Sequence, residues 1–443
     1  MTFITRFAPS PTGLLHIGNV RTALICYLLA KKNNGQFMLR LDDTDTERSR
    51  EEYAQAIQAD LKWLGLDWDI FSRQSTRTER YEEIKKKLIA DGRLYPCYET
   101  AEELDIKRKV LIGRGLPPIY DRAALSLSES DRAKLEEQGI QPHWRFKLDE
   151  TKSIEWDDLI KGTTRFEAKN LSDPVLIRAN GTPTYMLPSA IDDMDFGITH
   201  IVRGEDHVSN TAVQIQIFEA IGAKTPKFAH HSLMKGKEGK ISKRAGGFDV
   251  ASLKEQGIEP LAITSFMARL GTSEPVEPRT SLDDIANNFD LSKFGKSAAI
   301  YDFPELERMN PKVLHITSYD AIKHRDEIQG VDEEFWLSVR ANVSKLSDVK
   351  DWWEICKQQV TPIIDDVEFT SAASELLPEG QWDDETWNQW LNKVKETSGK
   401  KGKELFMPIR KALTAREHGP ELKHILPLIG RERAIARLKG EAA

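Results

Sequence analysis

The first stretch that could do chemistry is RFAPSPTGLLHIGN, residues 6–19. A short apolar segment before it predicts a strand, and apolar residues at helical spacing after it predict a helix. The free N–H groups and the dipole of a helix start attract anions, and Gly18 lets a ligand approach the backbone because it has no Cβ. We therefore expect a phosphate site here, with His16 donating a hydrogen bond to a phosphate oxygen.

A second stretch of this kind is the basic run KISKR, residues 240–244. Glycines flank it on both sides, at Gly236, Gly239, Gly246 and Gly247. A glycine-rich loop with two lysines and an arginine suits a triphosphate that moves during a reaction. A five-residue basic loop taken alone is more often a solvated surface loop, so its meaning depends on its combination with residues 6–19.

The elements around the first stretch predict a parallel sheet. Residues 36–41 alternate as a strand and end in an acidic run, LDDTDTERS. Ser49 and Glu52 have the spacing of a capping box, which predicts a helix start there. A strand, a helix and another strand within about sixty residues are typical of a βαβ unit. The carboxyl ends of such strands lie at one edge of the sheet, so the acidic run is expected beside residues 6–19.

The same arrangement recurs later in the chain. Residues 199–202 read as a strand, followed by Arg203 in a charged turn. Ser209 or Asn210 is expected to cap the next helix, which Gly222 ends. A guanidinium at a strand end can bind a carboxylate with two hydrogen bonds, although a surface ion pair is the commoner role for such an arginine.

Composition limits the class of protein. The chain has 443 residues, 40% hydrophobic and 30% charged, which suits a globular protein of two to four domains. Cys26, Cys97 and Cys356 are too scattered for a disulfide framework, and neither a secretory signal nor a membrane-spanning run is evident. We expect a cytoplasmic protein without a membrane partner.

Charge is unevenly distributed. The net charge of −7 argues against a nucleic-acid partner, but residues 400–443 hold eleven lysines and arginines against five acidic residues. A basic end on an acidic protein can attract a polyanion to that end, although such a run of charges more often forms a solvated helical face. Residues 280–400 show helical patterns with tryptophans, consistent with a helical bundle.

The motifs together resemble those of class I aminoacyl-tRNA synthetases. HIGN at 16–19 is similar to the HIGH motif and KISKR to the KMSKS loop, in the same order along the chain. RFAPSPTGLLHIGNVRTAL, GTPTYMLPSAIDDMDFGITHIVRGEDH and LFMPIRKALTAREHGPEL look like segments of bacterial glutamyl-tRNA synthetases. The resemblance covers most of the chain, apart from residues 280–400.

The resemblance implies an α/β Rossmann-like catalytic domain with an inserted α+β acceptor-binding domain and an all-α anticodon-binding region at the C-terminal end. The catalytic domain is expected at 1–94 and 186–240, and the insertion at 95–185. A stem-contact region with the KISKR loop is expected at 241–310, and the helical anticodon-binding region at 311–443.

The implied activity is the ATP-dependent attachment of L-glutamate to tRNA through a glutamyl-adenylate, with transfer to the 2′-hydroxyl of the terminal adenosine. The resemblance assigns catalytic roles to His16, Lys240 and Lys243. It assigns ATP binding, with Mg²⁺, to His16, Gly18, Asn19, Asp206, His207, Leu233 and Lys243. It assigns glutamate binding to Arg6, Ala8, Ser10, Asp42, Tyr185, Ser189 and Arg203.

Three positions depart from the family pattern. Asp42 stands where a glutamate is usual, and Ser189 where some relatives have asparagine. Family members often hold zinc with closely spaced cysteines in the insertion, whereas this chain has Cys97 followed by Glu99. One thiolate makes a poor zinc site, so we expect no structural zinc.

Several alternatives stay open. The tRNA partner is expected to be tRNA(Glu), but a non-discriminating enzyme or a paralogue specific for tRNA(Gln) has the same motifs. Glutaminyl-tRNA synthetase is the nearest rival, disfavoured by Arg203. A small nucleotidyltransferase would not need some two hundred residues beyond the KISKR loop. A non-catalytic RNA-binding paralogue could lose His16 or Lys243, and both are present. The family default for the oligomeric state is a monomer.

Overall fold

The computed structural model describes every residue except 1, 238, 240–246, 381 and 383. The chain divides into two compact units, one formed by Met1–Leu253 with Ile263–Phe303 and the other by Lys254–Ala262 with Pro304–Ala443. None of the helices in this described part has the length and apolar character that a membrane span requires.

The first unit is built on a five-stranded parallel sheet with the order β10-β9-β1-β2-β3. The strand at 36–41 is confirmed with the bounds predicted from the sequence. The one predicted at 199–202 is confirmed, but it begins one residue later and ends two residues later. The strands are β1 (Ile4–Phe7), β2 (Gln36–Leu41), β3 (Ile70–Arg73), β9 (His200–Gly204) and β10 (Lys227–His231).

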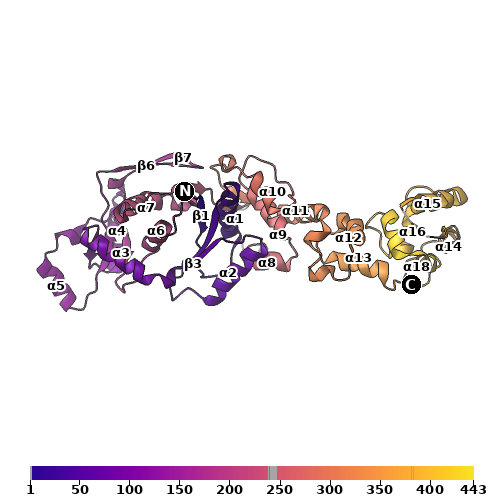
Figure 1. Cartoon of the computed structure of the whole chain (residues 1–443), viewed down its shortest axis with the longest axis horizontal. Helices are drawn as coiled ribbons and strands as arrows, with labels where there is room; N and C mark the ends of the chain where they lie inside the picture. Colours follow the sequence, from indigo (N-terminus) through magenta and orange to yellow (C-terminus); the bar gives the residue numbers. More distant parts are fainter. Residues whose placement is uncertain (1, 238, 240–246, 381, 383) are drawn as a thin grey trace. The chain divides into compact units, whose positions relative to one another are not determined.

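Helices cover both faces of this sheet (Figure 1). Phe37 of β2 packs edge-on against Tyr27 of α1, whereas its neighbour Met38 lies in the core formed with α3, α6 and α7. Successive side chains of a strand point to opposite faces, so β2 is buried on both sides and has no solvent-exposed face. The helices are α1 (Ile17–Lys32), α2 (Glu51–Trp63), α3 (Thr78–Ala90), α6 (Met186–Asp195) and α7 (Val208–Ile221).

Two expected helix caps are wrong. The helix α2 begins at Glu51, because the backbone N–H of Arg50 donates to the carbonyl of Pro11 and tertiary contacts fix the chain up to this point. The side chain of Ser49 therefore caps nothing. The helix α7 begins at Val208, directly after a 3₁₀ turn, so neither Ser209 nor Asn210 is its cap. Its end at Gly222, in the left-handed region with φ +81°, is as predicted.

Residues between α3 and α6 form two further sheets. One has the antiparallel order β4-β5-β8, and the other is the hairpin β6-β7. The strand-like pieces predicted near 143–148 and 164–166 are confirmed as β5 and β7. The elements are β4 (Leu94–Cys97), α4 (Ala101–Gly113), α5 (Glu129–Glu137), β5 (His143–Phe146), β6 (Ser153–Asp158), β7 (Gly162–Glu167) and β8 (Val175–Ile177).

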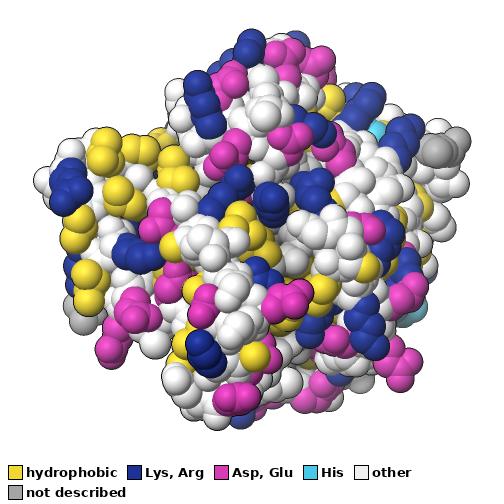
Figure 2. All heavy atoms as spheres, turned by 90° about the vertical axis from the view of Figure 1, so that its left-hand side faces the viewer, with side chains coloured by type: hydrophobic (Ala, Val, Ile, Leu, Met, Phe, Trp, Pro, Cys, Tyr) yellow, Lys and Arg dark blue, Asp and Glu magenta, His cyan; other side chains and the backbone are white. Residues whose placement is uncertain are grey.

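The outward face of this region mixes charges of both signs. Figure 2 shows lysines, arginines and acidic side chains interspersed there, with hydrophobic side chains gathered along one edge. The helix α4 buries none of its residues. We infer that no single charge sign dominates this face.

The first unit also contains a short parallel pair, β11 (Met234–Gly236) with β12 (Ala299–Tyr301), and the helix α10 (Leu282–Asn287). Three helices cross the boundaries between the units in sequence: α8 (Val250–Glu255), α9 (Pro260–Arg269) and α11 (Phe303–Ile316).

The second unit is helical, as the patterns at 280–400 predict. Its core includes the buried Trp336 and Trp390, whose indole N–H groups donate to the carbonyls of Thr317 and Ala373. These tryptophans are therefore part of the core. The helices, apart from short 3₁₀ turns, are α11 (Phe303–Ile316), α12 (Glu333–Val339), α13 (Asp348–Lys357), α14 (Val367–Glu375), α15 (Asp384–Ser398), α16 (Lys403–Thr414), α17 (Leu422–Ile429) and α18 (Arg431–Leu438).

Candidate active site

A cavity of about 520 Å³ opens at the carboxyl ends of β1 and β9. From β1 the sheet continues through β2 to β3, and from β9 it continues to β10, so the strand order reverses between β1 and β9. Ligands of open parallel sheets bind at such a reversal. The described residues assigned above to ATP or glutamate all line this cavity: Arg6, Ala8, Ser10, His16, Gly18, Asn19, Asp42, Tyr185, Ser189, Arg203, Asp206, His207 and Leu233.

His16 is the N-cap of α1. Its Nδ1 accepts hydrogen bonds from the backbone N–H groups of Gly18 at 3.1 Å and Asn19 at 3.3 Å. Because Nδ1 accepts, the ring proton must sit on Nε2. Partial desolvation lowers the pKa of His16 and favours the neutral ring, although the side chain keeps solvent exposure. A Cβ on residue 18 would lie 3.0 Å from the imidazole, so glycine there leaves room for this cap.

Arg203, at the end of β9, is a buried cation whose hydrogen-bond partners among the described residues are neutral. Its Nη2 donates to the hydroxyl of Thr211 at 2.6 Å and its Nε to His230 Nε2 at 3.3 Å. Among the described residues no carboxylate lies within ion-pair distance of it. Burial, with the nearby charge of Arg6, lowers the pKa of Arg203 to about 10. It remains charged at neutral pH, so the cavity wall offers one uncompensated guanidinium to an anion.

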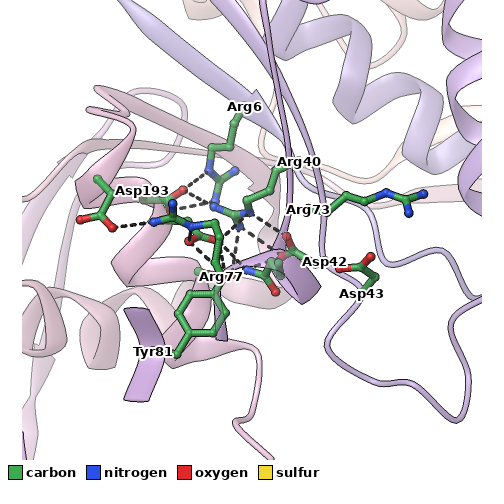
Figure 3. A network of polar contacts seen from close by, with 12 residues as sticks. Arg6, Arg40, Asp42, Asp43, Arg73, Arg77, Tyr81 and Asp193 are labelled. Carbon is green, nitrogen blue, oxygen red and sulfur yellow. Dashed lines mark hydrogen bonds and ion pairs between the residues drawn. The ribbon is translucent and has the colours of Figure 1, made fainter. Parts of the chain in front are cut away.

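The other two arginines that line the cavity in the described part of the chain, Arg6 and Arg40, are compensated by carboxylates (Figure 3). Arg6 Nε lies 3.1 Å from Asp193 Oδ1, and Arg40 Nη1 donates to the same oxygen at 2.8 Å. Arg40 also donates from Nε to Asp42 Oδ1 at 2.7 Å. These groups form a buried network in which the guanidinium groups of Arg6 and Arg40 are fixed by carboxylates.

Asp42 and Ser189, two positions that depart from the family pattern, lie together at the edge of this network. The Ser189 hydroxyl lies 3.3 Å from Asp42 Oδ2 and accepts a hydrogen bond from Arg40 Nη2 at 3.1 Å. The short aspartate is thus held against the wall by Arg40, and its side chain is 11% exposed to the cavity. Burial raises the pKa of Asp42 despite the adjacent guanidinium.

Asp192 supports the network from the adjacent position of α6. Its carboxylate accepts hydrogen bonds from Gln74, Arg77 and the hydroxyl of Tyr81. Arg77 also bonds Asp195 at 2.5 Å. These partners come from the segment that follows β3 and from α3, so α6 is joined to the sheet edge by hydrogen bonds as well as by apolar packing.

The remaining predicted residues form the outer wall. Tyr185 lies edge-on to His207, and its hydroxyl accepts a hydrogen bond from Asn210 at 2.5 Å. The side chains of Tyr185 and Leu233 are exposed at the opening. Lys240 and Lys243, with the rest of the KISKR loop, lie outside the described residues.

Polar contacts between side chains surround Cys97 and Glu99, where the resemblance would place a zinc site. Glu99 accepts a hydrogen bond from the hydroxyl of Tyr120 at 2.8 Å and forms an ion pair with Lys107 at 3.4 Å. Cys97 is buried, and burial raises the pKa of its thiol to about 11. In the described part of the chain no group of three or more His, Cys, Asp or Glu side chains is arranged to hold a metal. The absence of zinc remains a prediction.

Several groups in or behind the cavity wall were not predicted from the sequence. Arg40, Asp193, Thr211 and His230 were not singled out, although each bonds a residue that was, and Asp192 lies 3.6 Å from Arg40. Charged residues in buried strand or helix positions are the signal for such groups: Arg40 interrupts the apolar strand QFMLRL.

Comparison with known proteins gives the family. The model described as "tRNA synthetases class I (E and Q), catalytic domain" matches residues 2–308. The chain belongs to this family. A second model, "Anticodon binding domain", matches residues 357–441 of this synthetase. The resemblance and the fold class predicted from the sequence are therefore confirmed.

Relatives align along the whole synthetase. "Glutamate--tRNA ligase 1" of Rickettsia massiliae (strain Mtu5) is 54% identical over 443 residues, 98% of each chain. The protein of the same name from Parvibaculum lavamentivorans is 52% identical over 99% of this chain and 98% of its own. A crystal structure of a glutamate tRNA ligase from Elizabethkingia meningosepticum, in complex with its amino acid, aligns with a TM-score of 0.83 at 28% identity, covering 99% and 98% of the two chains.

Proposed function

We propose that this synthetase attaches L-glutamate to tRNA in two steps, through a glutamyl-adenylate. The observation that carries the proposal is Arg203, a buried guanidinium without a carboxylate partner among the described residues, in the cavity at the strand reversal. The full-length similarity to glutamate–tRNA ligases supports the same substrate.

Glutamate would bind with its side-chain carboxylate on Arg203. Glutamine is disfavoured because a neutral amide cannot complete a charged pair with a buried guanidinium. The α-ammonium group would approach Asp42 and Ser189, directly or through a water, since the Asp42 side chain retains some exposure to the cavity. Arg6, Ala8 and Ser10 would line the amino-acid site and Tyr185 would close it.

ATP would place its phosphates at the start of α1. His16 would donate from Nε2 to a phosphate oxygen, and the N–H groups and dipole of the helix start would add to this attraction, with Gly18 and Asn19 at the same end. Asp206, His207 and Leu233 would lie beside the adenosine. Lys243, with Lys240, would neutralise the charge that develops on pyrophosphate, and Mg²⁺ would arrive with ATP.

The chemistry requires no protein nucleophile. An oxygen of the glutamate α-carboxylate attacks the α-phosphorus of ATP, the bond to the β-phosphate oxygen breaks, and pyrophosphate leaves with the electron pair. The 2′-hydroxyl of the terminal adenosine of tRNA then attacks the adenylate carbonyl and loses its proton, and AMP leaves. The protein contributes positioning and stabilisation of the charge on the five-coordinate phosphorus.

We propose tRNA(Glu) as the acceptor, a cytoplasmic location and a monomeric state. The test is charging with labelled glutamate, ATP and Mg²⁺, on isolated tRNA(Glu) and tRNA(Gln) in parallel. Glutamate on tRNA(Glu) alone supports the proposal. Glutamate on tRNA(Gln), with or without tRNA(Glu), would replace it by a non-discriminating enzyme or a tRNA(Gln)-specific paralogue. Bound tRNA without any charging would leave a non-catalytic RNA-binding protein.

A further inference from the structure

Arg203 ends a line of hydrogen bonds that begins at the tip of the β6-β7 hairpin. Asp158, the last residue of β6, bonds through Oδ2 to His230 Nδ1 at 2.5 Å. His230 Nε2 lies 2.9 Å from the hydroxyl of Thr211, and both groups contact Arg203. These four residues come from the hairpin, β10, α7 and β9, so the line joins four elements of the first unit.

The donors and acceptors of this line constrain where its protons lie. The Asp158 carboxylate only accepts, so Nδ1 of His230 carries the ring proton and Nε2 accepts. The guanidinium of Arg203 only donates, so the Thr211 oxygen accepts from Nη2. The single lone pair of His230 Nε2 then faces two donors, the Thr211 hydroxyl at 2.9 Å and Arg203 Nε at 3.3 Å, and the carbonyl of His207 lies 3.3 Å from the same hydroxyl. Each side chain therefore fixes the orientation of the next.

Burial and backbone contacts hold this line rigidly. Asp158, His230 and Thr211 are 4%, 0% and 0% exposed, so little water competes for their hydrogen bonds. Asp158 Oδ1 accepts from the backbone N–H groups of Ile160, Lys161 and His230. Burial alone would raise the pKa of Asp158, but these bonds and His230 lower it to about 2, so the carboxylate stays ionised.

None of the three residues behind Arg203 lines the cavity. We propose that Asp158, His230 and Thr211 are positioning residues that hold the Arg203 guanidinium in the orientation that recognises a carboxylate. They determine specificity for glutamate without touching it. The proposal rests on the proposed function, in which Arg203 binds the side-chain carboxylate.

The decisive pair of variants is Thr211→Val and Thr211→Ser. Valine keeps the volume and loses the hydroxyl, whereas serine keeps the hydroxyl and loses a methyl group. We expect Thr211→Val to raise the KM for glutamate about ten-fold, as expected for the loss of one hydrogen bond to a charged group, with kcat changed less than about two-fold. Thr211→Ser should restore most of the affinity, whereas a merely packing role would make serine the worse variant.

Asp158→Asn tests the far end of the line, and Thr370→Val serves as the control. Asparagine weakens the acceptor for His230 Nδ1, so the KM for glutamate should rise in the same direction as in Thr211→Val. Thr370 is a buried threonine in the second unit whose hydroxyl donates to the carbonyl of Asp366. Its variant measures the effect of losing a buried hydroxyl away from the cavity, and its KM for glutamate should equal that of the wild type.

All variants are assayed as the full chain by aminoacylation at saturating ATP and tRNA, with glutamate varied. An unchanged KM for glutamate in Thr211→Val or in Asp158→Asn would overturn the proposal, as would serine behaving like valine. Arg203→Lys run in parallel separates this failure from that of the proposed function. If the KM of Arg203→Lys is also unchanged, Arg203 does not bind glutamate. If only Arg203→Lys is impaired, Arg203 binds glutamate without the positioning line.

Discussion

His16 joins two roles that substitution can separate. Its Nδ1 caps α1 by accepting hydrogen bonds from two backbone N–H groups, so the Nε2–H group is available to donate to a phosphate oxygen. His16→Ala removes both roles. The lost cap costs about 1 kcal/mol of unfolding free energy, and a lost donor to a transition-state oxygen lowers kcat about 10²-fold.

His16→Asn is the matched control, because asparagine is a good N-cap but its shorter amide does not reach the phosphate position of the imidazole. We expect the asparagine variant to regain most of the stability and little of the activity. Thermal unfolding and single-turnover charging of tRNA measure the two separately. The assigned role in chemistry would be refuted if His16→Asn regained activity together with stability. It would also be refuted if either variant had a kcat within about three-fold of the wild type.

Three further outcomes are expected. Arg437 is fully buried and donates to the carbonyls of Ile355, Leu413, Gln358 and Ala443. In a denaturant titration, Arg437→Met should lower the unfolding free energy of the second unit by about 3–5 kcal/mol. Lys439 is exposed, so the control variant Lys439→Met should leave this free energy unchanged. Burial, with Arg21 nearby, lowers the pKa of His231 to about 3. The unfolded chain therefore takes up a proton at a higher pH than the folded one, and the free energy of unfolding falls by on the order of 5 kcal/mol as the pH drops from 6.5 toward 3. His231→Gln should flatten the pH dependence of unfolding in this window. Lys243→Ala should lower kcat about 10²-fold with tRNA binding retained, and full charging activity would contradict the role proposed for the loop.

Local patterns predicted much of the parallel sheet. The strand at 36–41 and the helix end at Gly222 follow from residue periodicity and from the conformational freedom of glycine, which act within a few residues. The reversal of strand order could also be expected from the repeated arrangement of strand, turn and helix, which places residues 6–19 and Arg203 at one sheet edge.

The helix starts were wrong where distant contacts outweigh local capping. The hydrogen bond from Arg50 to Pro11 sets the start of α2, and Asn210 contacts Tyr185 instead of capping α7. The buried network was missed for the same reason. Arg40 and Asp193 are 153 positions apart, and the residues around either one give no indication that the two side chains form a hydrogen bond.

The most direct test of the role of Arg203 compares kcat/KM for glutamate and for glutamine when the wild-type synthetase charges isolated tRNA in the presence of ATP and Mg²⁺. We expect a glutamyl ester on the terminal adenosine and one pyrophosphate released per ester. Glutamine should be used at least about 10³-fold less efficiently, because the buried Arg203 guanidinium would be left without a carboxylate. Equal use of glutamine, or no ester with either amino acid, would refute this role of Arg203 or the proposed reaction.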